Sequence, residues 1–188
     1  MILGFLKKDP LRQTAISLYT EIVAAARRPE FFAEGRAPDT VEGRFEVLSL
    51  HMYLVLRRLK SEGAPGKALS QKLFDVFFQN MDDSLRELGV GDLTVGKKIR
   101  KMAEAFYGRT GAYEDALSDN DEASKTTKLA GAVARNVMGA DPENGAPMGA
   151  VAIAAFMQRA EQDLAVQSIG AFESGSVRFA DFSAPNEP

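Results

Sequence analysis

The sequence contains no cysteine, no tryptophan and a single histidine, His51, among its 188 residues. Without cysteine there can be no disulfide, no thiolate metal site and no cysteine nucleophile, and the absence is typical of proteins in a reducing compartment. One imidazole also excludes a metal site built from several histidines of one chain. The residues that most often carry metal and nucleophilic chemistry are therefore scarce or missing.

Long hydrophobic runs are missing as well. The start of the chain has about five apolar residues before Lys7, fewer than the ~7 to 15 in the core of a signal peptide. The longest stretch without charge, 144–158, is interrupted by Pro147 and is shorter than the ~20 residues that a membrane-spanning helix requires. We therefore expect a cytoplasmic protein without an export signal or a membrane span.

Charge is distributed unevenly along the chain. The whole sequence has 23 basic and 26 acidic residues and a net charge of -3. Residues 1–110 carry a balance of +4, whereas residues 111–188 carry -7. The first part is thus the one expected to meet phosphate-rich or acidic partners.

Apolar residues recur with helical spacing through most of the chain, which predicts an all-α protein. The expected helices cover residues 10–28, 40–59, 67–88, 92–108, 113–117, 122–138 and 147–169. Only residues 176–182 show an alternation that could suit a strand. We expect a compact single-domain bundle of about six to seven helices over residues 1–170, followed by a flexible tail over 171–188.

One short motif suggests nucleotide binding but does not fit its context. The segment GDLTVGKK, 91–98, matches a phosphate-binding P-loop except at its last position, where Lys98 stands in place of Ser or Thr. A P-loop follows a buried strand, whereas the charged end of a predicted helix precedes Gly91. We interpret the segment as a helix stop followed by a new helix start.

His51 is flanked by apolar residues on the second predicted helix. Burial with a hydrogen bond to a carboxylate is the favoured interpretation, with Asp75 of the next helix as a plausible partner. A haem ligand or a catalytic base is the alternative. The acidic group Asp75, Asp82 and Asp83 is interpreted as surface charge that pairs with Arg44, Arg57 or Arg86, or as a polar docking patch. A site for acid–base chemistry or cation binding is the alternative.

A basic run occupies residues 97–101 of the fourth predicted helix. Lys97, Lys98 and Lys101 project together, opposite an apolar face, which suits either a solvated surface or a helix resting on anionic lipid or RNA phosphate. No aromatic residues are interleaved with these charges, so neither base-specific reading nor DNA binding is indicated. The 12 Phe and 7 Met are mostly expected in the core, and some could line an adaptable apolar groove.

A series of short strings resembles a known family. They are GRFE, LH, FD, MD, LRE, GVGD, GK, KM and FYGR, at 43–46, 50–51, 74–75, 81–82, 85–87, 89–92, 96–97, 101–102 and 106–109. In this order they resemble the ubiquinol-cytochrome c chaperone family, the assembly factors of the cytochrome bc1 complex. The resemblance covers about residues 13–138 and fades after Met138.

This resemblance implies a non-enzymatic chaperone of the respiratory chain that needs no cofactor or metal. Its members bind newly made cytochrome b near the ribosome exit region, with a small partner protein in mitochondria. The bacterial branch, to which this chain is similar, implies a peripheral location on the cytoplasmic face of the inner membrane, beside an anionic lipid surface. A separate small partner subunit is not implied for that branch.

The resemblance also implies which residues meet a partner or hold the scaffold. These are the polar residues of the strings, namely Arg44, Glu46, His51, Asp75, Asp82, Arg86, Asp92, Lys97, Lys101 and Arg109. Buried ion pairs and helix caps would require the same residue types, so both roles stay open. His51 and Asp75 favour the scaffold, and Lys97 and Lys101 favour contact.

Two other functions remain as alternatives. One is a peripheral membrane module that binds anionic lipid or quinone through the basic helix. The other is an enzyme that uses His51 with Asp75.

Overall fold

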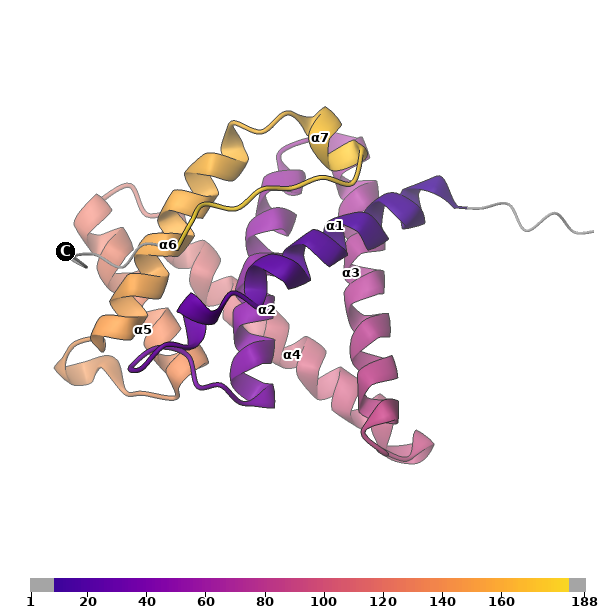
Figure 1. Ribbon diagram of the computed structural model, residues 1–188. Helices are drawn as coiled ribbons and strands as arrows, with labels where there is room; N and C mark the ends of the chain where they lie inside the picture. Colours follow the sequence, from indigo (N-terminus) through magenta and orange to yellow (C-terminus); the bar gives the residue numbers. More distant parts are fainter. Residues whose placement is uncertain (1–8, 183–188) are drawn as a thin grey trace, which may run out of the picture.

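The computed structural model describes residues 9–182, which form seven α-helices and two short 3-10 helices (Figure 1). The α-helices are α1 (Pro10–Ala26), α2 (Val41–Lys60), α3 (Gly63–Glu87), α4 (Asp92–Leu117), α5 (Glu122–Met138), α6 (Met148–Ala165) and α7 (Ile169–Glu173). The 3-10 helices are η1 (Pro29–Phe32) and η2 (Pro142–Asn144). The described residues contain no strand, which confirms the predicted all-α class and the number of helices.

The first helix begins where the sequence predicts and ends two residues before the predicted end at 28. The Asp9 carboxylate accepts a hydrogen bond from the Arg12 backbone N–H at 3.1 Å, and Pro10 occupies the first helical position. Such a cap satisfies one of the backbone donors that a helix start leaves unpaired. Pro29 cannot continue the helix and instead starts η1.

Helix α2 is the central element of the bundle. It begins at a Thr40 cap, whose hydroxyl accepts from the Gly43 N–H at 3.1 Å. Its side chains are buried on most of its girth, and it packs against α1, α3, α5 and α6. Burial around most of its girth is typical of a helix at the centre of a bundle.

Helices α3 and α4 are both longer than expected. Helix α3 starts at Gly63, four residues before the predicted start at 67. The turn from α2 into α3 is so tight that a Cβ on Gly66 would lie 2.1 Å from the Leu59 carbonyl oxygen. Helix α4 runs unbroken through Gly108 and Gly111, so the predicted stop at 108 is wrong. The two glycines cost about 1 kcal/mol each, which the burial of Phe106 and Tyr113 two turns apart on one face offsets.

Together α3 and α4 form a hairpin whose end projects beyond the rest of the bundle (Figure 1). The turn contains Gly89, with φ +81°, a left-handed conformation that glycine adopts without strain. Two leucines beside this turn are solvent-exposed, Leu88 by 69% and Leu93 by 94%. The end of the hairpin therefore displays apolar side chains instead of burying them.

The alanine-rich helices α5 and α6 pack against each other and against α2. Their small residues, among them Ala132, Ala134, Ala150 and Ala154, are fully or almost fully buried. Small side chains allow helix backbones to approach closely, so these alanines belong to the core.

The segment after residue 170 differs from the expected flexible tail. Helix α7 buries Phe172, and the chain then runs extended across the bundle to Phe182 (yellow in Figure 1). Val177 and Phe179 point into the core, while Arg178 between them is exposed, so the alternation in the sequence reflects one-sided burial without a sheet partner. Residues 183–188 lie outside the described part of the chain.

Among residues 9–182, no helix combines the length and the hydropathy needed to cross a bilayer.

Candidate functional site

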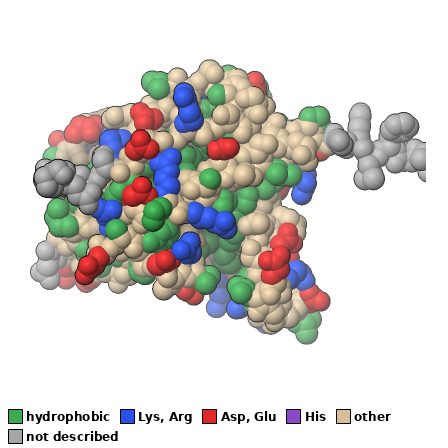
Figure 2. All heavy atoms as spheres, in the orientation of Figure 1, with side chains coloured by type: hydrophobic (Ala, Val, Ile, Leu, Met, Phe, Trp, Pro, Cys, Tyr) green, Lys and Arg blue, Asp and Glu red, His purple; other side chains and the backbone are tan. Residues whose placement is uncertain are grey.

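An open groove of about 430 Å³ lies between α1, α2, α3 and α4. Its lining is mainly apolar and consists of Tyr19, Val23, Ala26, Arg27, Val41, Arg44, Phe45, Leu48, Asn80, Met81, Ser84, Leu85, Leu88 and Met102. Figure 2 shows hydrophobic side chains in a hollow between the body of the molecule and the α3–α4 hairpin, with basic side chains at its edge. We call this feature the hairpin groove.

The floor of the hairpin groove is apolar and deformable. Phe45 and Leu48 of α2 are half-buried there, and Met81 and Met102 face them from the hairpin. Methionine is unbranched and flexible, so it adapts to partners of different shape. The rim adds Val41, which is 70% exposed, and Leu88.

The polar groups inside the groove carry no charge. The Tyr19 hydroxyl donates to the Asn80 side-chain oxygen at 2.9 Å, and burial raises the pKa of Tyr19 to about 12. A neutral, satisfied hydroxyl costs little against an apolar ligand. The groove therefore suits an apolar surface and contains no group poised for acid–base chemistry.

The charges at the rim are basic. Arg44 pairs with Asp39 at 2.6 Å and lies over the Phe32 ring, 4.9 Å from its centroid, while Arg27 is exposed on the other side. Arg44, a predicted partner-binding residue, is thus the member of that set that lies at the groove.

A second candidate surface is the outer side of α4 near the end of the hairpin. Lys97, Lys98, Arg100 and Lys101 are all exposed, and none of them forms an ion pair with a described residue. Val95 and Phe106 on the opposite side of the helix are buried. The expected arrangement, lysines outward and apolar residues inward, is therefore present.

Glu46 and Arg109 form an ion pair between α2 and α4. Arg109 of α4 donates to the Glu46 carboxylate of α2, and the Glu46 side chain is only 8% exposed. Burial raises the pKa of Glu46, and the Arg109 partner opposes that shift. A pair this buried joins the two helices but leaves neither charge for a partner.

His51 also lies in the interior, and the predicted contact with Asp75 is wrong. The imidazole Nδ1–H donates to the Val47 carbonyl oxygen at 2.7 Å, and the ring packs on Phe31 and Phe179 at centroid distances of 5.0 and 4.9 Å. Asp75 is exposed on α3, where it accepts from Gln71 at 2.8 Å. A helix pattern fixes which residues share a face, but not the rotation that brings two helices into contact.

Burial lowers the pKa of His51 to about 4. The ring is therefore neutral near pH 7, enclosed by aromatic side chains and away from the hairpin groove. This burial, and the exposed position of Asp75 on α3, argue against His51 acting as a catalytic base with Asp75.

Three predicted residues form one local network at the hairpin turn. Arg86 donates to Asp82 at 2.5 Å and also contacts Asp92, which links the end of α3 to the start of α4. The predicted pairing of Asp82 with Arg86 is thereby confirmed. These side chains are accessible, so they stabilise the turn beside the groove rather than a buried core.

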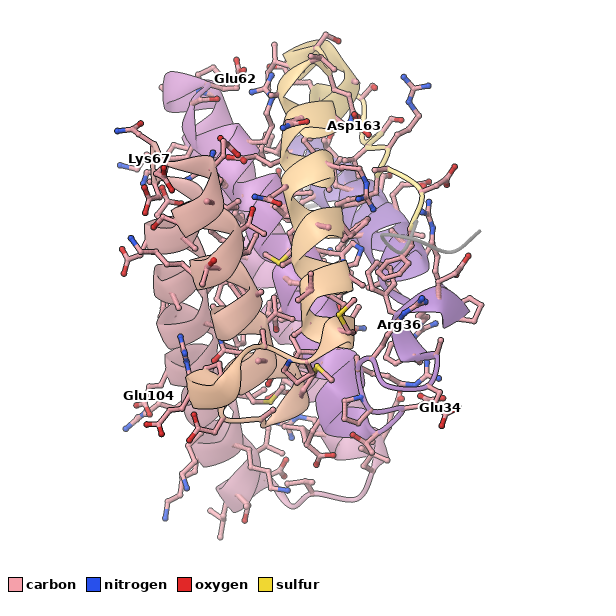
Figure 3. All side chains as sticks on the ribbon, turned by 90° about the vertical axis from the view of Figure 1, so that its left-hand side faces the viewer. Glu34, Arg36, Glu62, Lys67, Glu104 and Asp163 are labelled. Atoms are coloured by element: carbon pink, nitrogen blue, oxygen red, sulfur yellow. The ribbon has the colours of Figure 1, made fainter. Side chains whose placement is uncertain are left out.

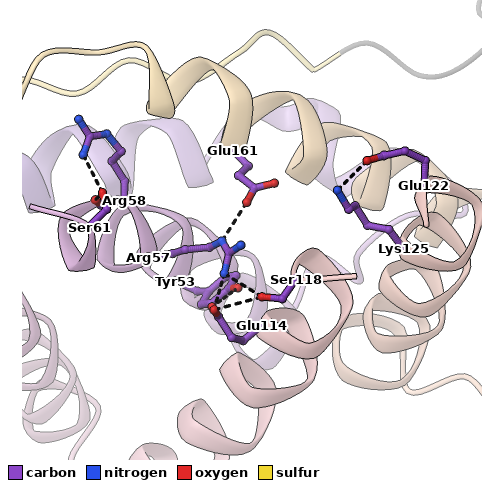
Figure 4. Close-up of polar contacts among 9 residues, drawn as sticks. All are labelled: Tyr53, Arg57, Arg58, Ser61, Glu114, Ser118, Glu122, Lys125 and Glu161. Atoms are coloured by element: carbon purple, nitrogen blue, oxygen red, sulfur yellow. Dashed lines mark hydrogen bonds and ion pairs between the residues drawn. The ribbon is translucent and has the colours of Figure 1, made fainter. Parts of the chain in front are cut away.

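A polar network that was not predicted from the sequence joins three helices (Figure 4). Arg57 of α2 pairs with Glu114 of α4 at 2.5 Å and with Glu161 of α6 at 2.9 Å, and the Tyr53 hydroxyl donates to Glu114 at 2.9 Å. Tyr53 and Arg57 lie four residues apart on one side of α2, and this spacing is the signal of the network that the sequence contains. Glu114 and Glu161 could not be assigned, because they lie 61 and 104 residues away from their partners.

Across the described residues, no group of three or more His, Asp and Glu side chains could hold a metal ion.

Comparison with known proteins adds independent information. A family model described as Ubiquinol-cytochrome C chaperone matches residues 33–179. The match extends well past Met138, where the sequence resemblance was expected to fade, and thus includes α6 and α7. These two helices contribute to the core around α2.

Curated relatives carry a consistent name. A Xenopus laevis protein named ubiquinol-cytochrome-c reductase complex assembly factor 1 is 28% identical over 131 residues, covering 70% of this chain and 63% of the relative. The human protein of that name is 26% identical over 114 residues, covering 61% of this chain and 38% of the relative. The chain thus spans less than two thirds of the length of these relatives.

A solved structure has the same arrangement of helices. The crystal structure of the Cbp3 homolog from Brucella abortus superposes with a TM-score of 0.78 and 39% sequence identity. The superposition covers 92% of both chains, so nearly the whole fold described above is shared.

Proposed function

Since the chain belongs to the ubiquinol-cytochrome c chaperone family, which is a family of chaperones and not of enzymes, we propose that it binds newly made cytochrome b and promotes assembly of the cytochrome bc1 complex. The relatives are named as assembly factors of that complex, which supports the proposal. Because the chain spans only part of their length, client, partners and location are all part of what we propose.

The hairpin groove is the observation that carries the proposal. A newly made membrane protein exposes apolar helices that must be covered until they are inserted, and an open apolar groove with adaptable walls offers such cover. The groove has neutral polar groups inside and basic residues only at its rim. We assign it to one apolar segment of the client, with Arg27 and Arg44 placed to meet acidic or headgroup-bound ends of that segment.

The candidate partner-binding residues divide between two roles under this proposal. Arg44 is accessible at the groove, so we propose it for contact with the client. Lys97 and Lys101 on α4 are accessible outside the groove, so we propose them for contact with a different surface. Glu46, His51 and Arg109 are proposed for the scaffold because they are buried or paired inside it. Asp75, Asp82, Arg86 and Asp92 lie on the outside of the hairpin, where we propose that they stabilise its helices and turn.

Complementation in a deletion strain tests this function. A strain that lacks the gene should lose assembled bc1 complex while its subunits are still transcribed. The wild-type chain should restore the complex, whereas a variant with Val41→Asp and Leu88→Asp at the groove rim should restore at most about a tenth of it, because each change puts a charge where the client must lose water.

The matched control carries the same two charges elsewhere. Met148 and Val166 are 70% and 86% exposed, like the rim residues, but lie outside the groove. Met148→Asp with Val166→Asp should restore the complex to wild-type levels. Normal bc1 content in the deletion strain, or equal behaviour of the two double variants, would contradict the proposal.

A further inference from the structure

The outer face of α4 at the end of the hairpin combines a fully exposed leucine with several basic residues. Leu93, Lys97 and Lys101 follow each other at intervals of four residues, so they lie one above the other on one side of the helix. Arg100 belongs to the same side, seven residues after Leu93, and Lys98 lies at the edge of this side, next to Lys101. We call Leu93, Lys97, Lys98, Arg100 and Lys101 the α4 outer face.

The charges of the α4 outer face are not neutralised by their surroundings. None of its four basic side chains pairs with a described acidic residue. The acids of α3 lie elsewhere: Asp82 is held by Arg86, and Asp83 lines a shallow groove beside α1. Figure 2 shows acidic side chains gathered on α3 near the hairpin's end, and Glu104 is the acid that follows the basic run on α4.

Leu93 gives this face its second property. The side chain is 94% exposed, whereas Val95, Phe106 and Tyr113 of the same helix are buried. Tyr107, which is 61% exposed, is a second apolar side chain of α4 that faces solvent. An exposed leucine next to several lysines on one side of a helix is typical of a helix that enters the boundary between lipid headgroups and acyl chains. The lysine stems can lie along the same apolar layer while their ammonium groups stay with the headgroups.

We propose that the α4 outer face docks the protein on an anionic lipid bilayer, with Leu93 entering the acyl boundary and the basic residues meeting lipid phosphates. Each basic side chain near an anionic membrane adds to the attraction, which falls off within a Debye length. The end of the hairpin that carries this face projects beyond the bundle (Figure 1).

The observations favour lipid over other ligands of similar charge. RNA phosphate would satisfy the lysines but gain nothing from an exposed leucine, and single-stranded RNA is usually held by exposed aromatic rings. Quinone carries no charge and would leave the basic residues without partners. An anionic bilayer accepts both the basic residues and the leucine of this face.

Lipid docking is independent of the proposed client. Vesicles contain no cytochrome b, so their binding can fail while the client still binds, and the reverse also holds. If both proposals are right, docking brings the hairpin groove next to the membrane into which the client is inserted.

Flotation of the full chain with vesicles tests the proposal. With phosphatidylcholine vesicles containing anionic phosphatidylglycerol, the wild-type chain should float, and raised salt should release it. Vesicles of phosphatidylcholine alone should not bind it. The Lys97→Glu and Lys101→Glu double variant should bind about 100-fold more weakly, and Leu93→Ser about tenfold more weakly.

Matched variants control for net charge and for exposed apolar surface. Lys67→Glu with Arg135→Glu makes the same change in net charge, and Figure 3 places Lys67 near the opposite end of the molecule from Glu104. Val166→Ser matches Leu93→Ser at another exposed position. Both controls should float like the wild type, and unchanged melting temperatures show that every variant is folded.

Three results would overturn the proposal. One is a wild-type chain that does not float with anionic vesicles. Another is equal binding by the α4 double variant and its control. The third is binding that Leu93→Ser leaves intact and that RNA displaces at equal phosphate concentration, which would make the face a nucleic-acid surface.

Discussion

The body around α2, α5 and α6 differs from the end of the α3–α4 hairpin in how far apolar side chains are buried and charged side chains are paired. The body encloses Phe156 and His51 completely and pairs its charged residues across helices, as Arg57 does with Glu114 and Glu161. The end of the hairpin exposes Leu88, and its lysines form no ion pair with any residue in the part of the chain that the structure describes. The body thus determines the fold, and the hairpin carries the surface that remains free for partners.

The largest difference should appear when aromatic side chains of the body are removed. Phe156 is fully buried, and its ring lies 4.9 Å from that of Phe31. Phe156→Ala should lower the free energy of unfolding by about 4 kcal/mol, because the cavity cannot close around helices this tightly packed. Urea denaturation checks the value, and a loss below about 1 kcal/mol would show that the body is not the stabilising region.

Breaking the buried ion pair should have the next largest effect. Arg109→Ala leaves the Glu46 carboxylate buried without its partner and should cost about 3 kcal/mol. Arg86→Ala, which removes the exposed pairs at the hairpin turn, should cost clearly less. Equal losses in parallel urea titrations would erase the distinction between body and hairpin.

The aromatic enclosure of His51 predicts a pH dependence. Burial lowers its pKa from 6.5 to about 4, so below pH 6.5 the unfolded chain takes up a proton that the folded chain excludes. Stability should therefore be complete above pH 6.5 and fall by about 2 kcal/mol between pH 6.5 and 5 on account of this residue.

The variant His51→Phe separates this effect from the other titrating groups. Glu46, whose pKa is raised, acts in the opposite direction, since its contribution to stability is lost as pH rises. The difference in stability between wild type and variant, measured by urea unfolding at several pH values, should vary by about 2 kcal/mol over this range. A constant difference would mean that His51 is accessible to protons in the folded state.

The smallest effect on stability is expected at the hairpin. Leu88→Asp should change the free energy of unfolding by less than about 0.5 kcal/mol, because the side chain is already 69% exposed. The same substitution should weaken client binding strongly. A large loss of stability would instead make Leu88 part of the core.

The sequence predicted the body better than the hairpin for a physical reason. Periodicity shows which residues of a segment form the apolar side of a helix, and caps mark where the helix begins and ends. The ranges of α1, α2 and α5 are therefore close to the predicted ones. Gly108 was interpreted as a stop because local propensity favours one, but packing of Phe106 and Tyr113 overrides it. The pairing of Asp82 with Arg86 was predictable because the two are four residues apart on one helix.

Contacts between distant segments could not be predicted. Asp75 was expected beside His51, but the rotation of α3 places it in solvent, while Phe179 from the supposed tail covers the imidazole. The hairpin groove is a further example, since Phe45, Met81 and Leu85 follow the same periodicity as core residues. The groove beside these residues results from how α1, α2 and the hairpin are placed relative to one another, which the sequence pattern does not show.

The central claim is that the hairpin groove holds cytochrome b, and site-specific photo-cross-linking during synthesis tests it most directly. A photoreactive residue at Leu88 or Val41 should cross-link newly made cytochrome b, whereas one at Gln162, exposed on α6, should not. Cross-links to cytochrome b at Gln162 with none at the groove, or no cross-link at any of the three positions, would contradict the account.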